Sequence, residues 1–289
     1  MIDGLDINAL AAAAAQEDDF TKEKQGGGDF EYELPEAGTA LFRFREYIEL
    51  GLQPTATKAF PNKKPGQKAR LVFELVTPKH IKEIEVDGNK VRIAPTVSCT
   101  LTISNSPKSN FMKLFKLLNW QGNAVHPAQL LGAAYLGQII HGFAAEDLEN
   151  GKPKAGAKPR YANFQKDGVY TFAPPRIVDP IENTIREIPV PELLNPRKLF
   201  LWKKPTKECW DSIFIEGTRT VKENGADVEK SKNFLQEMCL KALDFKGSEL
   251  QKLLLVGDTA GLNDLPVTEE KATTQATAPV KDPLADLGI

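Results

Sequence analysis

The chain has 289 residues, 41% of them apolar and 26% charged, with a formal net charge of −2. This composition predicts a globular protein with a sizeable buried core. The three cysteines form no Cys-x-x-Cys pair, which argues against a disulfide framework and a zinc site. The sequence shows neither a signal peptide nor an apolar stretch of membrane-spanning length. We therefore expect a cytoplasmic protein that holds no metal and no cofactor.

The charge is unevenly distributed along the chain. Residues 1–40 hold 10 acidic and 2 basic side chains, whereas residues 41–160 hold 18 basic and 9 acidic ones. Residues 251–289 are acidic again, with 6 acidic and 3 basic side chains. A basic central part between acidic ends favours an anionic partner for that part, although a basic surface without any ligand is about equally common.

Residues 1–37 are predicted to form a mobile acidic arm. An alanine-rich segment of high helix propensity is followed by Gly26, Gly27 and Gly28, which make a flexible joint. A turn at residues 35–38 then places the start of the folded body near residue 38.

Three amphipathic strands are predicted to open the body, at residues 41–52, 69–76 and 96–103. Apolar and polar side chains alternate in each, which is typical of a strand with one buried face. The inward face of the first strand is predicted to consist of Phe42, Phe44, Ile48 and Leu50. Its outward face is predicted to consist of Leu41, Arg43, Arg45 and Tyr47. The inward residues of the other two strands are Leu71, Phe73, Leu75, Val97, Cys99, Leu101 and Ile103, and Arg70, Val72 and Glu74 point outward.

The connections between these strands have their own signals. Residues 53–68 form a loop rich in lysine and too rich in proline for a helix. Asp87 and Gly88, between alternating apolar residues, predict a hairpin before the third strand. After the third strand, Ser106 as N-cap and Pro107 at the first helical position predict a helix.

A fourth strand is predicted at residues 130–143, with a bend at its glycines. A second lysine-rich loop, residues 144–159, leads to two closing strands at residues 160–164 and 169–172. The strands of the body are thus interrupted by one helix and by two basic loops.

Beyond the body, seven prolines in residues 173–205 predict an extended segment that wraps around it. Helices are predicted at residues 206–215 and 228–245, and a third begins after the cap residue Ser248. Residues 257–289, rich in threonine, alanine, proline and acidic residues, are predicted to form a disordered acidic tail.

Three strands, a helix and two further strands are the connectivity of an OB-fold, a five-stranded antiparallel barrel. The expected class is therefore mainly β with added helices (α+β). We expect an OB-fold-like body at residues 38–173, with a helical C-terminal extension at residues 174–256 packed on it. An OB-fold binds oligonucleotides on its second and third strands and through the loops after its first and fourth strands. Both of those loops are the lysine-rich ones.

The two basic loops predict that lysines follow the phosphates of a nucleic acid and that aromatic rings stack on its bases. The candidate phosphate contacts in the loops are Lys58, Lys63, Lys64, Lys152, Lys154 and Lys158. The candidate stacking residues are Tyr47, Phe60 and Tyr161. The alternative interpretation is that lysines solubilise any loop and that aromatic residues in strands belong to the core.

Five segments of the chain are distinctive: REYIELGLQ (45–53), KARLVFEL (68–75), FMKLFKLLNW (111–120), LLGAAYLGQIIH (130–141) and RYANF (160–164). Together they resemble a family of bacteriophage single-stranded DNA-binding replication proteins, over about residues 38–250. The resemblance implies an OB-type body that coats single-stranded DNA in replication, recombination and repair, and it implies no catalytic residue. The matching basic residues are Arg43, Arg45, Lys68, Arg70 and Arg160.

The chain contains no GxxxxGK[ST] phosphate loop, HExxH zinc motif or GxSxG nucleophile motif. We therefore predict a stoichiometric binding protein and not an enzyme, with single-stranded DNA as its partner. The alternative is a phage virion or scaffold-type structural protein that does not bind DNA. A nuclease or recombination enzyme ranks below both.

The last eight residues combine acidic and apolar side chains. Such a tip can dock in a basic-rimmed pocket of a replication protein such as a polymerase, helicase or nuclease, although short acidic tails often serve only solubility. The candidate partner-binding residues are Asp282, Leu284, Asp286, Leu287 and Ile289.

Overall fold

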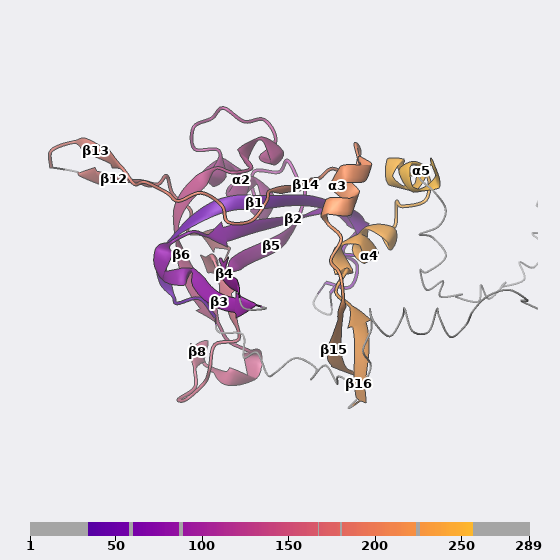
Figure 1. Cartoon of the computed structure of the whole chain (residues 1–289), viewed down its shortest axis with the longest axis horizontal. Coiled ribbons are helices and arrows are strands. Elements are labelled where there is room, and N and C mark those ends of the chain that lie inside the picture. Colours follow the sequence, from indigo (N-terminus) through magenta and orange to yellow (C-terminus); the bar gives the residue numbers. More distant parts are fainter. Residues whose placement is uncertain are drawn as a thin grey trace, which may run out of the picture.

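The computed structural model describes residues 34–256, apart from residues 58–59, 87–88, 167, 180 and 224–225 (Figure 1). The predicted acidic tail lies outside the described residues, as does all but the end of the predicted N-terminal arm. Antiparallel strands dominate the described part and the helices are short, which confirms the mainly β, α+β class.

One sheet organises the molecule, with the strand order β5-β2-β1-β6-β9 and with β14 paired in parallel to β1. Its strands are β1 (Gly38–Gln53), β2 (Gly66–Leu75), β5 (Thr96–Thr102), β6 (Ala134–Gly142), β9 (Tyr161–Asn163) and β14 (Lys198–Phe200). One edge of β1 pairs with β2, whereas its other edge pairs first with β6 and then with β14. The long strand β1 therefore lies at the centre of the fold.

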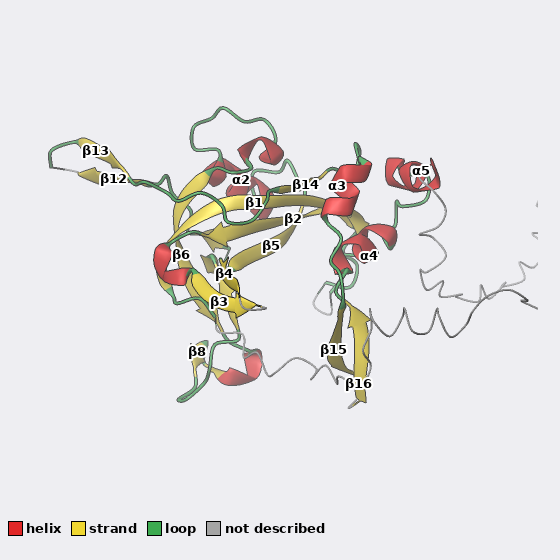
Figure 2. Ribbon diagram, viewed as in Figure 1, coloured by secondary structure: helices red, strands yellow, loops and turns green. Residues whose placement is uncertain are grey.

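The remaining strands form two-stranded hairpins, two of which project from the sheet as separate arms, β12–β13 and β15–β16 (Figure 2). The hairpins are β3–β4 (Lys82–Val86, Asn89–Ile93), β7–β8 (Leu148–Glu149, Lys152–Pro153), β10–β11 (Gln165–Lys166, Val169–Tyr170), β12–β13 (Arg176–Asp179, Thr184–Glu187) and β15–β16 (Thr218–Glu223, Ala226–Ser231). Among the described residues, the α-helices are α2 (Asn110–Leu118), α3 (Lys207–Ser212), α4 (Phe234–Leu240) and α5 (Glu249–Val256), with 3₁₀ turns at Pro78–His80, Pro127–Leu130 and Ala145–Asp147.

The sheet is open in the described part of the chain. Strands β5 and β9 approach each other to within 8 Å at their Cα atoms, but no hydrogen-bonded pairing joins them among the described residues. The predicted closed barrel is therefore not seen as a continuous hydrogen-bonded ring.

The sheet and the C-terminal helices enclose two separate cores. The first core lies between the inner face of the sheet and α2, and it is rich in aromatic rings such as Phe44 and Phe73, which stack at a centroid distance of 5.0 Å. The second core lies between the end of β1, β14 and helices α3 to α5. Its fully buried members include Ile48, Leu50, Phe200, Ile213, Cys239 and Leu250.

A β-bulge in β1 divides the strand between these two cores. Phe44 pairs with Phe73 of β2 and Glu46 with Val72, so that Arg45 is one extra residue on β1. The extra residue reverses the alternation: Tyr47 enters the first core, and Ile48 enters the second. The prediction that Ile48 and Leu50 share a face with Phe42 and Phe44 is therefore wrong, as is the prediction that Tyr47 points outward.

Several predicted helix and strand boundaries also need correction. Helix α2 is capped by Ser109, whose side-chain oxygen accepts from the Met112 N–H at 3.1 Å, and not by Ser106. The fourth strand begins at Ala134, because Pro127–Leu130 forms a 3₁₀ turn. The helix predicted at residues 228–245 begins only at Phe234, since the preceding residues pair as β16 with β15.

Gly51 is required at the end of β1, and this requirement can be tested. Its φ of +73° disfavours any side chain, and a Cβ atom there would lie 2.7 Å from the Ala242 Cβ and 2.8 Å from the Trp202 ring. Gly51→Ala is expected to lower the free energy of unfolding by about 2–5 kcal/mol, from backbone strain plus overpacking.

Gly122→Ala is the matched control, because Gly122 has a φ of +70° but a Cβ atom added there would meet nothing within 4 Å. This control should lose only the backbone part, about 1–2 kcal/mol. Urea unfolding of the two variants measures the difference, and equal losses would show that the second core accommodates the added methyl group without strain.

Candidate nucleic-acid interface

The outer face of β1 and β2 is covered by residues 190–197, which we call the strap. Arg43, predicted to face a nucleic acid, donates hydrogen bonds from its guanidinium to the carbonyl oxygens of Val190 at 2.9 Å and Pro191 at 2.6 Å. It also pairs with the Glu192 carboxylate at 2.8 Å. Arg43 points outward from the sheet, as predicted. Its side chain is only 14% exposed, however, because the strap covers it, and its contacts hold the strap in place.

A buried carboxylate anchors the strap on β2. Glu74 is fully buried and accepts hydrogen bonds from the Leu194 N–H at 2.7 Å and from the Asn195 side-chain amide at 2.8 Å. Arg45 lies 3.9 Å from the same carboxylate and 3.3 Å from Glu46. A buried charge needs such partners to offset its lost hydration, so Arg45 is also committed to the strap and its surroundings.

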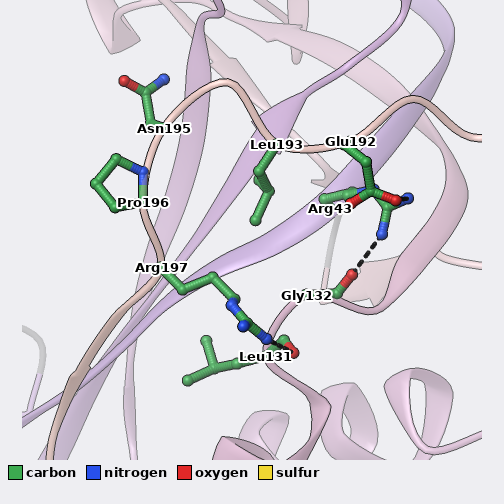
Figure 3. Close-up of a pocket in the computed structure, with 8 residues that line it drawn as sticks. All are labelled: Arg43, Leu131, Gly132, Glu192, Leu193, Asn195, Pro196 and Arg197. Carbon is green, nitrogen blue, oxygen red and sulfur yellow. Dashed lines mark hydrogen bonds and ion pairs between the residues drawn. The ribbon is translucent and has the colours of Figure 1, made fainter.

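A cavity of about 440 Å³ lies between the strap and the turn before β6 (Figure 3). Arg43 and Arg197 enter it from opposite sides, but both donate to backbone carbonyl oxygens, those of Gly132 at 2.8 Å and Leu131 at 3.4 Å. The cavity therefore reflects how the strap is held on the sheet. The Arg43 guanidinium is largely occupied by these contacts, whereas Arg197 is exposed and makes one long hydrogen bond.

Two more predicted DNA contacts are withdrawn from the surface, Arg70 partly and Tyr47 completely. The Arg70 guanidinium lies 5.4 Å from the centre of the Phe234 ring of α4, and burial lowers the pKa of Arg70. Tyr47 is 0% exposed, and burial raises the pKa of Tyr47, whose hydroxyl donates to Glu49 at 3.2 Å. Its ring packs edge-on against His126, so the interpretation of Tyr47 as a base-stacking residue is wrong.

The loop between β1 and β2 does present accessible candidates. Phe60 is 68% exposed, and Lys63 and Lys64 beside it are exposed as well. Thr57 and Phe60 exchange two backbone hydrogen bonds of 3.0 and 3.2 Å, which hold the aromatic residue at a defined place in the loop. Lys58 lies outside the described residues. This loop thus offers an aromatic ring flanked by positive charge.

At the base of this loop, Lys68 extends back along the chain. Its ammonium group donates to the Pro54 carbonyl oxygen at 3.1 Å and leaves part of the side chain accessible. On the neighbouring strand, Thr102 pairs with Lys68, and Ser98 and Thr100 expose hydroxyl groups on the outer face of β5. The outer face of β5 is therefore a polar strip that the strap does not cover.

The loop between β6 and β9 carries the second group of candidates. Lys152, Lys154 and Lys158 are exposed, and Lys154 donates to the Glu146 carbonyl oxygen at 2.6 Å. Arg160 pairs with the carboxylates of Glu146 at 3.1 Å and Asp147 at 3.4 Å, which offset part of its charge. Lys152 and Lys158 are the cations of this loop best placed to meet a phosphate.

Tyr161 follows this loop at the start of β9. Its ring is 51% exposed and covers Gly142 of β6 so closely that a Cβ atom on Gly142 would collide with it. One side of the ring thus packs on the sheet while the other is open to solvent. This arrangement fits a stacking surface and also fits simple packing on a glycine.

The structure thus brings the exposed candidate DNA contacts together in two groups. Four other candidates make contacts within the protein instead, as described above. Phe60, Lys63, Lys64 and Lys68 share one end of β2, and the second group surrounds the β6–β9 connection. Sequence reasoning misses a third group, the exposed cations of the β15–β16 hairpin, because the sequence pattern predicts a helix over part of that segment. The dipeptide Asn224-Gly225 between two alternating runs is the hairpin signal that identifies it.

Comparisons of the chain with protein-family models, curated proteins and solved structures find no match. Within the described residues, no helix is long and apolar enough to span a membrane. Over the same part of the chain, no cluster of three or more histidine, cysteine, aspartate or glutamate side chains is placed to hold a metal ion.

The strap contacts predict a specific phenotype for Arg43. Arg43→Ala is expected to lower the free energy of unfolding by roughly 1–3 kcal/mol, because it leaves strap carbonyl groups without their donor. Lys63→Ala, an exposed loop substitution, should stay within about 0.5 kcal/mol of the original protein. Urea unfolding of both variants tests this, and an Arg43→Ala protein of unchanged stability with weakened DNA binding would contradict the structural role.

Proposed function

We propose that this protein binds and coats single-stranded DNA through an OB-type body. The observation that carries the proposal is the strand order β5-β2-β1-β6-β9 with α2 between β5 and β6. An OB-fold has this order and this helix, and it can be partly open. The β3–β4 hairpin is then an insertion between the second and third OB strands. The family resemblance of the sequence supports the same conclusion.

The proposed path for the strand runs along the outer face of β5 between the two basic loops. Lys63 and Lys64 would neutralise phosphates at one end, and Lys152 and Lys158 at the other. Phe60 offers an exposed ring on which any base can stack, since every base has a π-face. Binding of this kind depends on charge and stacking and therefore has little sequence preference.

The mode of action is stoichiometric in this proposal. A bound strand is kept from re-pairing and from nucleases during replication and recombination, and no chemical step is needed. The rival, an assembly protein of a virion or scaffold, gains some support from the projecting β12–β13 hairpin, which exposes apolar residues such as Ile177, Val178 and Ile185. Only the first function requires tight, salt-sensitive binding to single strands.

The central test is titration of a fluorescent oligothymidylate at salt concentrations from about 50 to 200 mM, where log K should fall with a slope of about −0.7 per phosphate contact. The pair Lys63→Ala and Lys64→Ala should reduce the slope by about 1.4 if both lysines meet phosphates. Phe60→Ala should cost about 1–3 kcal/mol of binding free energy.

The matched control pair is Lys113→Ala and Lys116→Ala, which removes two exposed charges from α2. Its affinity and salt slope should equal those of the original protein. An original protein that fails to bind, or loop and α2 variants that lose the same affinity, would contradict the proposal.

We also propose that the acidic-apolar tip, residues 282–289, recruits a replication protein. Deleting these residues should leave the unfolding midpoint unchanged, keep or slightly tighten DNA binding, and abolish co-purification of the polymerase, helicase or nuclease partner. The measurement is affinity purification of both forms from the same producing cells. If the truncated chain retained every partner, the tip would have no recruiting role.

A further inference from the structure

The loop that carries Phe60, residues 54–65, leaves the sheet from a short stretch of ladder. A second register shift in β1, between residues 49 and 52, is followed by the pairs Leu52–Gln67 and Gln53–Gly66, where β1 ends and β2 begins. Pro54 and Pro65 come next on the two sides, and a proline has no backbone N–H with which to extend the ladder. The β1–β2 ladder alone therefore gives the base of this loop little support.

A carboxylate of the C-terminal extension bridges both strands at this base. Asp244, which follows α4, accepts from the Leu52 N–H of β1 at 2.7 Å and from the Gln67 side-chain amide of β2 at 2.5 Å. The preceding residue, Leu243, donates its backbone N–H to the Leu52 carbonyl oxygen at 2.8 Å. A carboxylate has two acceptor oxygens, so it can serve one donor on each strand at the same time.

A buried amide makes a second connection between the end of β1 and α4, which lies at this end of the sheet (Figure 1). Gln53 is 7% exposed, and its side-chain amide donates to the Met238 carbonyl oxygen of α4 at 2.8 Å and to the Leu50 carbonyl oxygen at 2.7 Å. The last two residues of β1 are therefore both hydrogen-bonded to the C-terminal extension.

Contacts inside the loop carry this support from its base toward the aromatic ring. The Thr55 hydroxyl donates to the Lys64 carbonyl oxygen at 2.5 Å and joins the two sides of the loop. Further out, the Phe60 N–H donates to the Thr57 carbonyl oxygen at 3.0 Å. The position of the Phe60 ring thus depends on how the base of the loop is held.

From these contacts we infer that Asp244 is a positioning residue for single-stranded DNA. It holds the base of the loop so that the Phe60 ring and the neighbouring lysines meet the strand. The inference rests on the proposed function and gives the C-terminal extension a part in it. Asp244 acts through the loop and not by touching the DNA, because a carboxylate repels phosphates.

The substitution Asp244→Asn tests this role. The new amide keeps an oxygen for the Leu52 N–H, but it turns an N–H donor toward the Gln67 amide, which is a donor as well. The readout is the ratio of the affinities for oligothymidylate and for an abasic oligomer of the same length. Stacking on one base contributes about 5- to 150-fold to affinity, so this ratio should fall about fivefold or more.

The ratio isolates positioning from two other effects of the substitution. A smaller folded fraction lowers both affinities equally. The lost negative charge raises both affinities equally, since the two oligomers carry the same phosphates. In the Phe60→Ala background, where the stacking ring is absent, Asp244→Asn should lower the ratio no further.

Asp179→Asn is the matched control, because Asp179 also accepts two hydrogen bonds, from the N–H groups of Ile181 at 2.8 Å and Glu182 at 3.1 Å. It makes the same substitution at the β12–β13 hairpin and should leave the ratio unchanged. Adding Gln67→Glu to Asp244→Asn exchanges donor and acceptor, which restores a hydrogen bond and should recover most of the ratio. If Asp244→Asn fails to fold, Gln67→Met removes the donor to Asp244 and should lower the ratio in the same way.

The outcomes distinguish this inference from the proposed function. An original protein that binds neither oligomer overturns both. An original protein that binds, with the same ratio for Asp244→Asn and Asp179→Asn, overturns only the positioning role. A lower ratio for Asp244→Asn that Gln67→Glu restores supports it.

Discussion

The bulge at Arg45 is the constraint on which the other parts of the structure depend. Without the bulge, all the apolar residues of β1 would lie on one face of the strand, and a single core would have to bury that face. With it, Phe42, Phe44 and Tyr47 pack under the sheet, while Ile48 and Leu50 require a second cover on the other side. That cover is provided by β14 and helices α3 to α5. The C-terminal part is therefore attached to the body by packing on the second half of the central strand β1.

The same division decides which surface remains for a ligand. The strap closes the outer face of β1 and β2 through Arg43, Arg45 and the buried Glu74, and α4 covers the part that includes Arg70. Within the described residues, the outer face of β5 and the exposed lysines of the two basic loops remain open. The candidate interface therefore consists mainly of lysines in the loops between the strands, and not of the arginines on the strands themselves. The long side chains of surface lysines suit a ligand that is itself flexible and irregular.

Much of the fold is accessible from the sequence, because alternation of apolar residues identifies β1, β2 and β5 and their inward residues with a period of two. The register beyond Arg45 cannot be predicted from the sequence, since the bulge depends on how β1 pairs with β2 and does not change the residue pattern of β1. Proline content predicts that residues 173–205 are extended, but not where they lie. Arg43 looks the same in a sequence whether water or the strap covers it, so the sequence alone does not reveal its contacts with the strap. The sequence does not predict the hairpin at residues 218–231. Val228 lies at helical spacing from the apolar residues of α4, so the pattern assigns it to a helix.

The parallel pairing of β14 with β1 has a consequence for the order of events during synthesis. Lys198 pairs with Glu46, a residue made about 150 positions earlier, and helices α3 to α5 follow later still. At about 5–20 residues per second, the ribosome needs roughly 8–30 s to make the intervening chain. During that interval the first half of β1 can pair with β2 and β6, whereas Ile48 and Leu50 have no cover. The nascent chain therefore carries an exposed apolar strand end until the residues of the second core have been made.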